Sequence, residues 1–108
     1  MRDLLRMHLT SAGYEVEVAE DAIAAGYAAL RGPPDLIICD VEMPHMTGLE
    51  LIAGLREEKA LAKVPVIFLT SFDEGHARAR ELGAAEYLPK PIRLEVLLDA
   101  VQRHLPPD

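Results

Sequence analysis

The sequence has 108 residues and a formal net charge of −7, from 18 acidic and 11 basic residues. Its length fits one domain, and a hydrophobic content of 50% with only 5% aromatic residues predicts an aliphatic core. The acidic balance argues against direct binding to nucleic acid or to an anionic membrane, because both need a basic face.

The cellular setting follows from cysteine usage and from hydropathy. Cys39 is the single cysteine, so no internal disulfide can form and a reducing compartment fits best. No apolar run approaches the roughly 20 residues of a membrane span. The charged residues near the N-terminus argue against a signal peptide. We therefore expect a cytoplasmic protein that does not bind a membrane.

The first half of the chain alternates between helical and strand patterns. Residues 2–12 have a helical pattern, and residues 14–18 alternate strictly between apolar and charged side chains, as in a half-buried strand. An Ala-rich helix begins at Glu20-Asp21 and ends near Gly32. Residues 36–39 are wholly apolar, which predicts a short strand buried on both faces.

The second half continues the alternation. A helix is predicted over 47–58, a fully apolar strand over 64–69, and a helix after the polar loop 70–75 that ends at Gly83. A short strand at 86–88 and a last helix over 92–105 complete the series. Strands that alternate with helices predict a doubly wound α/β domain with a parallel sheet and helices on both faces.

Three polar residues follow three successive predicted strands. Asp40 follows residues 36–39, Thr70 follows 64–69, and Lys90 follows the last strand. Ligands of open parallel sheets bind at the carboxyl ends of the strands, so these side chains should meet at one edge. A carboxylate, a hydroxyl and an ammonium suit phosphoryl transfer: Asp40 as the nucleophile, with Thr70 and Lys90 on the phosphoryl oxygens.

The stretches around these residues are distinctive as a set. They read DLIICDVEMPHMTG at 35–48, VPVIFLTS at 64–71 and GAAEYLPKP at 83–91. In this order and spacing they closely resemble the receiver domains of two-component response regulators, which have a flavodoxin-like fold. The resemblance runs along essentially the whole chain, and it implies a receiver domain over 1–105 with a tail or linker at 106–108.

The resemblance implies a role for each matching residue. Asp40 would accept a phosphoryl group from a histidine kinase or a phosphotransfer protein. Thr70 would be the switch hydroxyl and Tyr87 the switch aromatic, and Lys90 would contact the phosphoryl group and precede a cis peptide bond to Pro91. Magnesium would be bound by Asp40 and by the backbone carbonyl of Glu42, whose side chain would influence the lifetime of the phosphoryl group.

The N-terminus departs from the family pattern. Receivers begin with a strand that ends in a pair of acidic residues, whereas Met1 here corresponds to a position inside the first helix. We therefore expect four strands instead of five, an incomplete magnesium site and weak phosphorylation. The strand at 14–18 could close onto the strand at 36–39, another chain could contribute a strand, or the first helix and strand could be exchanged in a swapped dimer. We favour a dimer or higher assembly through residues 1–35.

Three functions are open at this point. The leading one is a phospho-regulated switch, not an enzyme, that signals to a downstream protein or an output domain. The second is a degenerate receiver that acts as a phosphorylation-independent interaction module. The third, a hydrolase of the haloacid dehalogenase type, needs an aspartate two residues after the nucleophile, where this sequence has Glu42.

Overall fold

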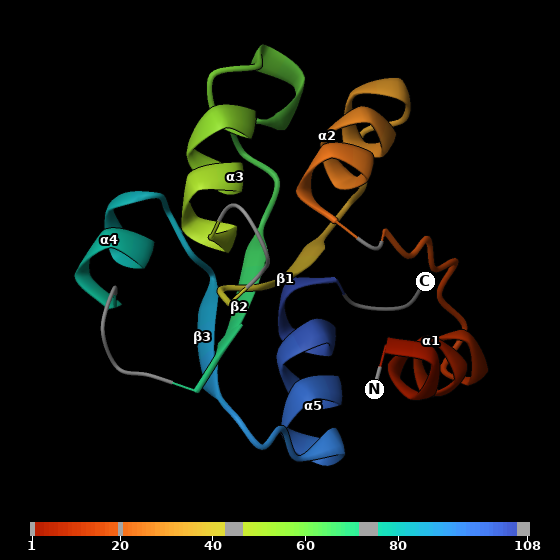
Figure 1. The fold of residues 1–108 in the computed structure, drawn as a ribbon. Coiled ribbons are helices and arrows are strands. Elements are labelled where there is room, and N and C mark those ends of the chain that lie inside the picture. The colour runs from red at the N-terminus through yellow and green to blue at the C-terminus, as the bar shows by residue number, and fades with distance from the viewer. Residues whose placement is uncertain (1, 20, 43–46, 72–75, 106–108) are drawn as a thin grey trace.

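A three-stranded parallel sheet with helices on both faces forms the centre of the computed structural model (Figure 1). The structure describes residues 2–19, 21–42, 47–71 and 76–105. The predicted tail at 106–108 and most of the loop at 70–75 lie outside the described residues. The flavodoxin-like α/β fold expected from the sequence is confirmed.

Apart from residues 14–18 and a short 3-10 helix that was not predicted, the elements follow one another in the predicted order. The helices are α1 (Arg2–Ser11), α2 (Ala22–Arg31), α3 (Gly48–Leu55), the 3-10 helix η1 (Lys59–Leu61), α4 (His76–Glu81) and α5 (Leu94–His104). The strands are β1 (Ile37–Asp40), β2 (Val66–Thr70) and β3 (Glu86–Pro89), in the order β1-β2-β3. None of the helices within the described residues has the length and apolar character needed to cross a membrane.

The helix predicted over 47–58 ends earlier than its pattern indicates. Thr47 caps α3 through a capping box, in which its hydroxyl accepts from the Glu50 N–H and the Glu50 carboxylate accepts from the Thr47 N–H. The helix ends at Leu55, and the separate turn η1 follows, with Leu61 buried in the core. Residues 56–59 are all charged (REEK), and this polar stretch did not mark the end of the helix in the sequence.

Two apolar clusters cover the two faces of the sheet. On one face, Phe68 of β2 packs with buried residues of α2, α3, η1 and α4. On the other face, Ile67 and Leu69 pack with Leu9 of α1 and with the buried side of α5. All five side chains of β2 are buried, because this strand has a neighbour on each edge and helices on each face.

The predicted strand at 14–18 is wrong. This segment has no strand assignment, and the described residues form three strands instead of the expected four. Tyr14 and Val16 still pack against the α1–α5 side of the sheet, and the Tyr14 hydroxyl donates to the Leu105 carbonyl at 3.0 Å. Alternation therefore identified Tyr14 and Val16 as inward-facing, whereas Val18 is 38% exposed. A strand also requires a hydrogen-bonded neighbouring strand, and within the described residues this segment has none.

One edge of β1 has no partner among the described residues. The N–H groups of Ile37 and Val41 donate to Pro65 and Leu69, both at 2.9 Å. Because alternate residues of a strand point their backbone groups to opposite sides, Ile38 and Asp40 direct theirs to the open edge. The prediction that residues 36–39 form a strand buried on both faces is partly wrong, because Ile37 and Ile38 are only half-buried.

We expect this edge to make the chain self-associate. An open strand edge is a template for another strand, and exposed apolar side chains of α2 lie on one helical face, with Ile23 73% exposed and Tyr27 67% exposed. Light scattering at low micromolar concentration should give a mass above that of the monomer. A monodisperse, well-folded monomer over a range of concentrations would contradict this expectation.

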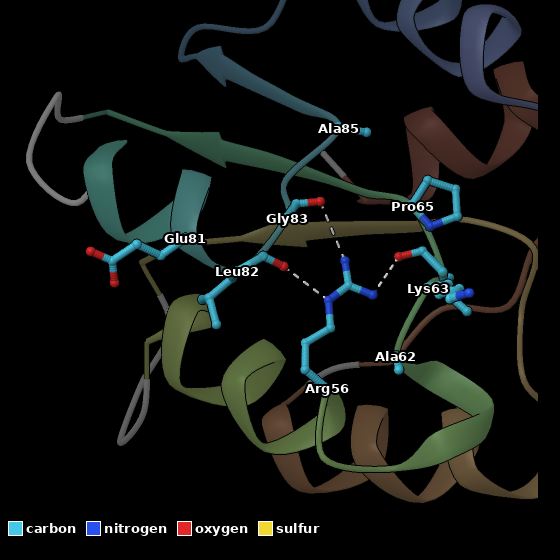
Figure 2. Close-up of a pocket in the computed structure, with 9 residues that line it drawn as sticks. Arg56, Ala62, Lys63, Pro65, Glu81, Leu82, Gly83 and Ala85 are labelled. Atoms are coloured by element: carbon cyan, nitrogen blue, oxygen red, sulfur yellow. Dashed lines mark hydrogen bonds between the residues drawn. The ribbon is translucent and has the colours of Figure 1, made fainter.

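Arg56 connects two loops at the end of the sheet opposite the carboxyl ends of the strands. It lies in a surface hollow lined by residues 62–65, 81–83 and 85 (Figure 2). Its guanidinium donates to the carbonyl oxygens of Leu82 at 3.0 Å, Leu61 at 2.9 Å and Val64 at 2.6 Å. One side chain thus joins the turn before β2 to the turn before β3.

Replacement of Arg56 by alanine should lower the free energy of unfolding by about 1–3 kcal/mol, since several carbonyl oxygens lose a charged donor. Chemical denaturation measures this difference. Arg78→Ala is the matched control, because Arg78 is exposed and its ion pair among the described residues is the (i, i+3) pair with Glu81. This substitution should change stability by less than about 0.5 kcal/mol. Equal effects of the two substitutions would contradict the assigned role of Arg56.

Candidate functional site

The three sequence-predicted residues meet at the carboxyl ends of the strands. Asp40 ends β1, Thr70 ends β2, and Lys90 directly follows β3. The parallel register aligns these ends, and the Lys90 N–H donates to the Thr70 carbonyl at 2.7 Å. The predicted convergence is confirmed, because Lys90 lies on the same edge as Asp40 and reaches it.

The Lys90 ammonium lies between two carboxylates. Its Nζ forms an ion pair with Oδ1 of Asp40 and lies 3.6 Å from Oε1 of Glu42. Burial by itself would lower the pKa of Lys90, but the hydrogen bond and the charges of Asp40 and Glu42 outweigh it and raise that pKa. The Lys90-Pro91 peptide bond is cis, as the resemblance implied.

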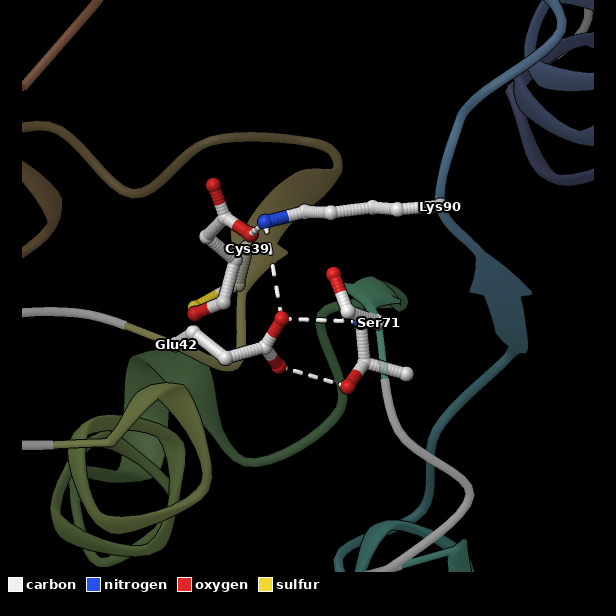
Figure 3. Close-up of polar contacts among 6 residues, drawn as sticks. Cys39, Glu42, Ser71 and Lys90 are labelled. Carbon is white, nitrogen blue, oxygen red and sulfur yellow. Dashed lines mark hydrogen bonds and ion pairs between the residues drawn. The ribbon is translucent and has the colours of Figure 1, made fainter.

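The Glu42 side chain makes hydrogen bonds at this edge that the sequence did not predict. Its Oε2 accepts from the Thr70 hydroxyl at 2.5 Å, and its Oε1 accepts from the Ser71 N–H at 2.8 Å (Figure 3). Partial burial opposes the charge, but the bonds from Thr70 and Ser71 and the charge of Lys90 prevail and lower the pKa of Glu42. The carboxylate is therefore ionised and held in place.

Tyr87 lies behind the site, in the middle of the β3 pairing with β2. Its partner in the register is Phe68, and the two ring centroids lie 6.4 Å apart with an interplanar angle of 56°. Tyr87 is half-buried and packs against the cluster that contains α3 and α4. This position is compatible with both readings of the sequence, a core aromatic and a switch aromatic, so the switch role stays a prediction.

Gly48 allows the start of α3 to approach the end of β1. A Cβ atom at Gly48 would lie 2.1 Å from the Asp40 carbonyl oxygen and 2.8 Å from Cys39 Sγ. The Gly48 N–H also donates to the Val41 carbonyl at 2.8 Å. Burial, together with the charge of Asp40, raises the pKa of Cys39 to about 12, which fits a packed core thiol and not a reactive one.

The Gly48→Ala variant should lower the free energy of unfolding by about 1–3 kcal/mol, because the methyl group has no room beside Asp40. Gly54→Ala on the same helix is the control. No atom lies within 4 Å of the added Cβ, so this change should stabilise the protein by about 0.5–1 kcal/mol. Thermal denaturation of the pair tests the sign of each effect, and a tolerated Gly48→Ala would argue against the close approach.

The residues proposed for magnesium do not form a complete site. Asp40 would supply its carboxylate and Glu42 its backbone carbonyl, and the Asp40 carboxylate already forms an ion pair with Lys90. Within the part of the chain that the structure describes, no group of three or more His, Cys, Asp or Glu side chains could hold a metal. Mg²⁺ requires near-octahedral oxygen ligation, so this donor set does not fit the ion without further ligands.

Sequence reasoning missed two groups of the structure. The Ser71 N–H faces Glu42, and a backbone donor carries no signal in residue identity, although its position directly after Thr70 at a strand end was a hint. Arg56 was missed because its carbonyl partners are separated from it by up to 27 positions.

The comparisons with known proteins agree with this geometry. A family model described as the response regulator receiver domain matches residues 1–102. The chain belongs to this family. The response regulator MprA of Mycobacterium leprae (strain TN) is 38% identical over 104 residues, which cover 94% of this chain and 45% of that protein. The chain thus spans less than half the length of the curated relatives it matches.

Solved receiver structures superpose closely on the chain. The chemotaxis protein CheY4 of Vibrio cholerae has a TM-score of 0.89 at 37% identity, with 96% of this chain and 88% of that chain covered. The response regulator TrrA of Thermotoga maritima, solved in complex with Mg²⁺ and beryllium fluoride, has a TM-score of 0.83 at 32% identity and covers 96% of this chain and 89% of that chain.

Proposed function

We propose that this receiver domain accepts a phosphoryl group on Asp40 from a histidine kinase or a phosphotransfer protein. The observation that carries the proposal is the convergence of four groups on one edge: the Asp40 carboxylate, the Thr70 hydroxyl, the Ser71 N–H and the Lys90 ammonium. The Asp40 side chain is 38% exposed, so a donor protein has access to it.

The transfer step follows from these groups. A carboxylate oxygen of Asp40 forms a bond to phosphorus while the bond from phosphorus to the donor's imidazole nitrogen breaks, and the imidazole keeps the electron pair. The product is an acyl phosphate. Lys90 is placed to neutralise one phosphoryl oxygen, and Thr70 and Ser71 are placed to donate to another. We derive no step through magnesium, because the described residues do not complete its site.

The proposed output is a change in the surface around β3. A hydrogen bond from the Thr70 hydroxyl to the phosphoryl group would shift the end of β2. Tyr87, which packs beside Phe68, would then change its orientation. The reader would be a downstream protein, a second copy of this chain or an output domain. We expect a cytoplasmic signalling domain that acts on proteins, without enzymatic turnover of a separate substrate and without direct contact with nucleic acid.

We expect acetyl phosphate with Mg²⁺ to label the chain slowly and below stoichiometry, because a divalent ion must offset the charge that develops during transfer and its site is incomplete. Intact-mass spectrometry measures the added phosphoryl group. Asp40→Asn should abolish the labelling. Labelling that persists in Asp40→Asn would overturn the assignment of the acceptor, and rapid stoichiometric labelling would contradict the expected effect of the incomplete metal site.

A second candidate function is a phosphorylation-independent interaction module. The incomplete donor set for magnesium favours it. The close grouping of Asp40, Thr70 and Lys90 opposes it, since a binding surface alone does not require a carboxylate beside an oxyanion-binding set. A complete lack of labelling under phosphodonor and kinase conditions would support this candidate.

A further inference from the structure

The Glu42 carboxylate fills the donor set that the proposed function assigns to a phosphoryl group. It accepts from Thr70 at 2.5 Å and from Ser71 at 2.8 Å, and it lies 3.6 Å from the Lys90 ammonium. Figure 3 shows its two oxygens directed at Ser71 and its neighbour, with the Lys90 side chain extending toward the same carboxylate. A planar anion with two oxygens thus occupies a site built for an oxyanion.

The fold places these donors at the end of β2 and directly after it. Thr70 is buried, with 2% of its surface exposed, and its hydroxyl lies at the end of the central strand. Ser71 contributes a backbone N–H, whose direction is set by the same strand end. Glu42, in contrast, has 31% of its side chain exposed, and the space toward solvent lets this carboxylate leave.

We propose that Glu42 is an internal stand-in for the phosphoryl group, which holds the Thr70–Ser71–Lys90 donor set in the unphosphorylated protein and must leave before Asp40 can be phosphorylated. This inference rests on the proposed function. The exchange involves no covalent chemistry: one carboxylate leaves the donors and the phosphoryl oxygens replace it.

The Glu42 carboxylate and a phosphoryl group on Asp40 would compete for the same donor hydrogens. A threonine hydroxyl carries one donor hydrogen, and so does a backbone N–H. The Thr70 hydrogen directed at Glu42 cannot at the same time bind a phosphoryl oxygen on Asp40. Both anions also draw on the Lys90 charge, so Glu42 in place both blocks the donors and repels the incoming phosphoryl group.

The first experiment follows the Thr70 and Ser71 donor protons in the absence of a phosphodonor. Two-dimensional NMR of the full chain is recorded for the unchanged protein, Glu42→Ala and the control Glu57→Ala, which alters an exposed glutamate on the segment after α3. Glu42→Ala should move the Ser71 amide proton upfield and speed the exchange of the Thr70 hydroxyl proton, while Glu57→Ala leaves both unchanged. Unchanged signals in Glu42→Ala would overturn the proposal.

The second experiment measures competition. With acetyl phosphate and Mg²⁺, Glu42→Ala should be labelled at least about tenfold faster than the unchanged chain, the factor expected when a charge-assisted hydrogen bond no longer has to be broken. Glu42→Gln keeps one acceptor oxygen without the charge and should lie between the two. Equal labelling rates in all three proteins would contradict the proposed competition between Glu42 and the phosphoryl group.

The two readouts separate this inference from the proposed function. If no variant is labelled while the Ser71 and Thr70 signals respond to Glu42→Ala, the phospho-acceptor role of Asp40 fails and the occupancy by Glu42 stands. If Asp40 is labelled in every protein at one rate and the NMR signals do not respond, the acceptor role stands and the inference about Glu42 fails.

Discussion

The central strand β2 is the constraint on which the rest of this structure depends. It pairs with β1 on one edge and with β3 on the other, and its five residues are all buried. Because both pairings are parallel and in register, the carboxyl ends of all three strands lie at the same edge. The positions of Asp40 and Thr70 therefore follow from the strand pairing around Phe68, and Lys90 directly follows β3 at the same edge.

Among the residues that the structure describes, Lys90 is the cation that balances the carboxylates at this edge. Lys90 contacts both Asp40 and Glu42, so the three side chains carry one net negative charge. A second anion in this position competes with Asp40 for the same ammonium group. The arrangement suits an exchange of anions, since whichever group binds the Thr70 and Ser71 donors also gains the attraction of Lys90.

The edge of the sheet at β1 has a different character from the edge at β3. Ile37 and Ile38 are only half-buried, and the backbone groups of Ile38 and Asp40 face away from β2. Asp40 belongs to this strand, so whatever pairs with the open edge also affects the acceptor. Self-association and phosphorylation would then be coupled through the same four residues of β1.

The sequence by itself determined the layered fold and the residues at the strand ends. Alternating apolar strands and helices require a parallel sheet, and a parallel sheet brings the residues that follow its strands to one edge, so Asp40, Thr70 and Lys90 could be grouped without coordinates. Tertiary structure alone decided that residues 14–18 are not a strand, because pairing needs a neighbouring backbone that side-chain alternation does not reveal. It also decided the direction of the Glu42 side chain, since a flexible carboxylate takes its position from donors on another strand, 28 residues away along the chain.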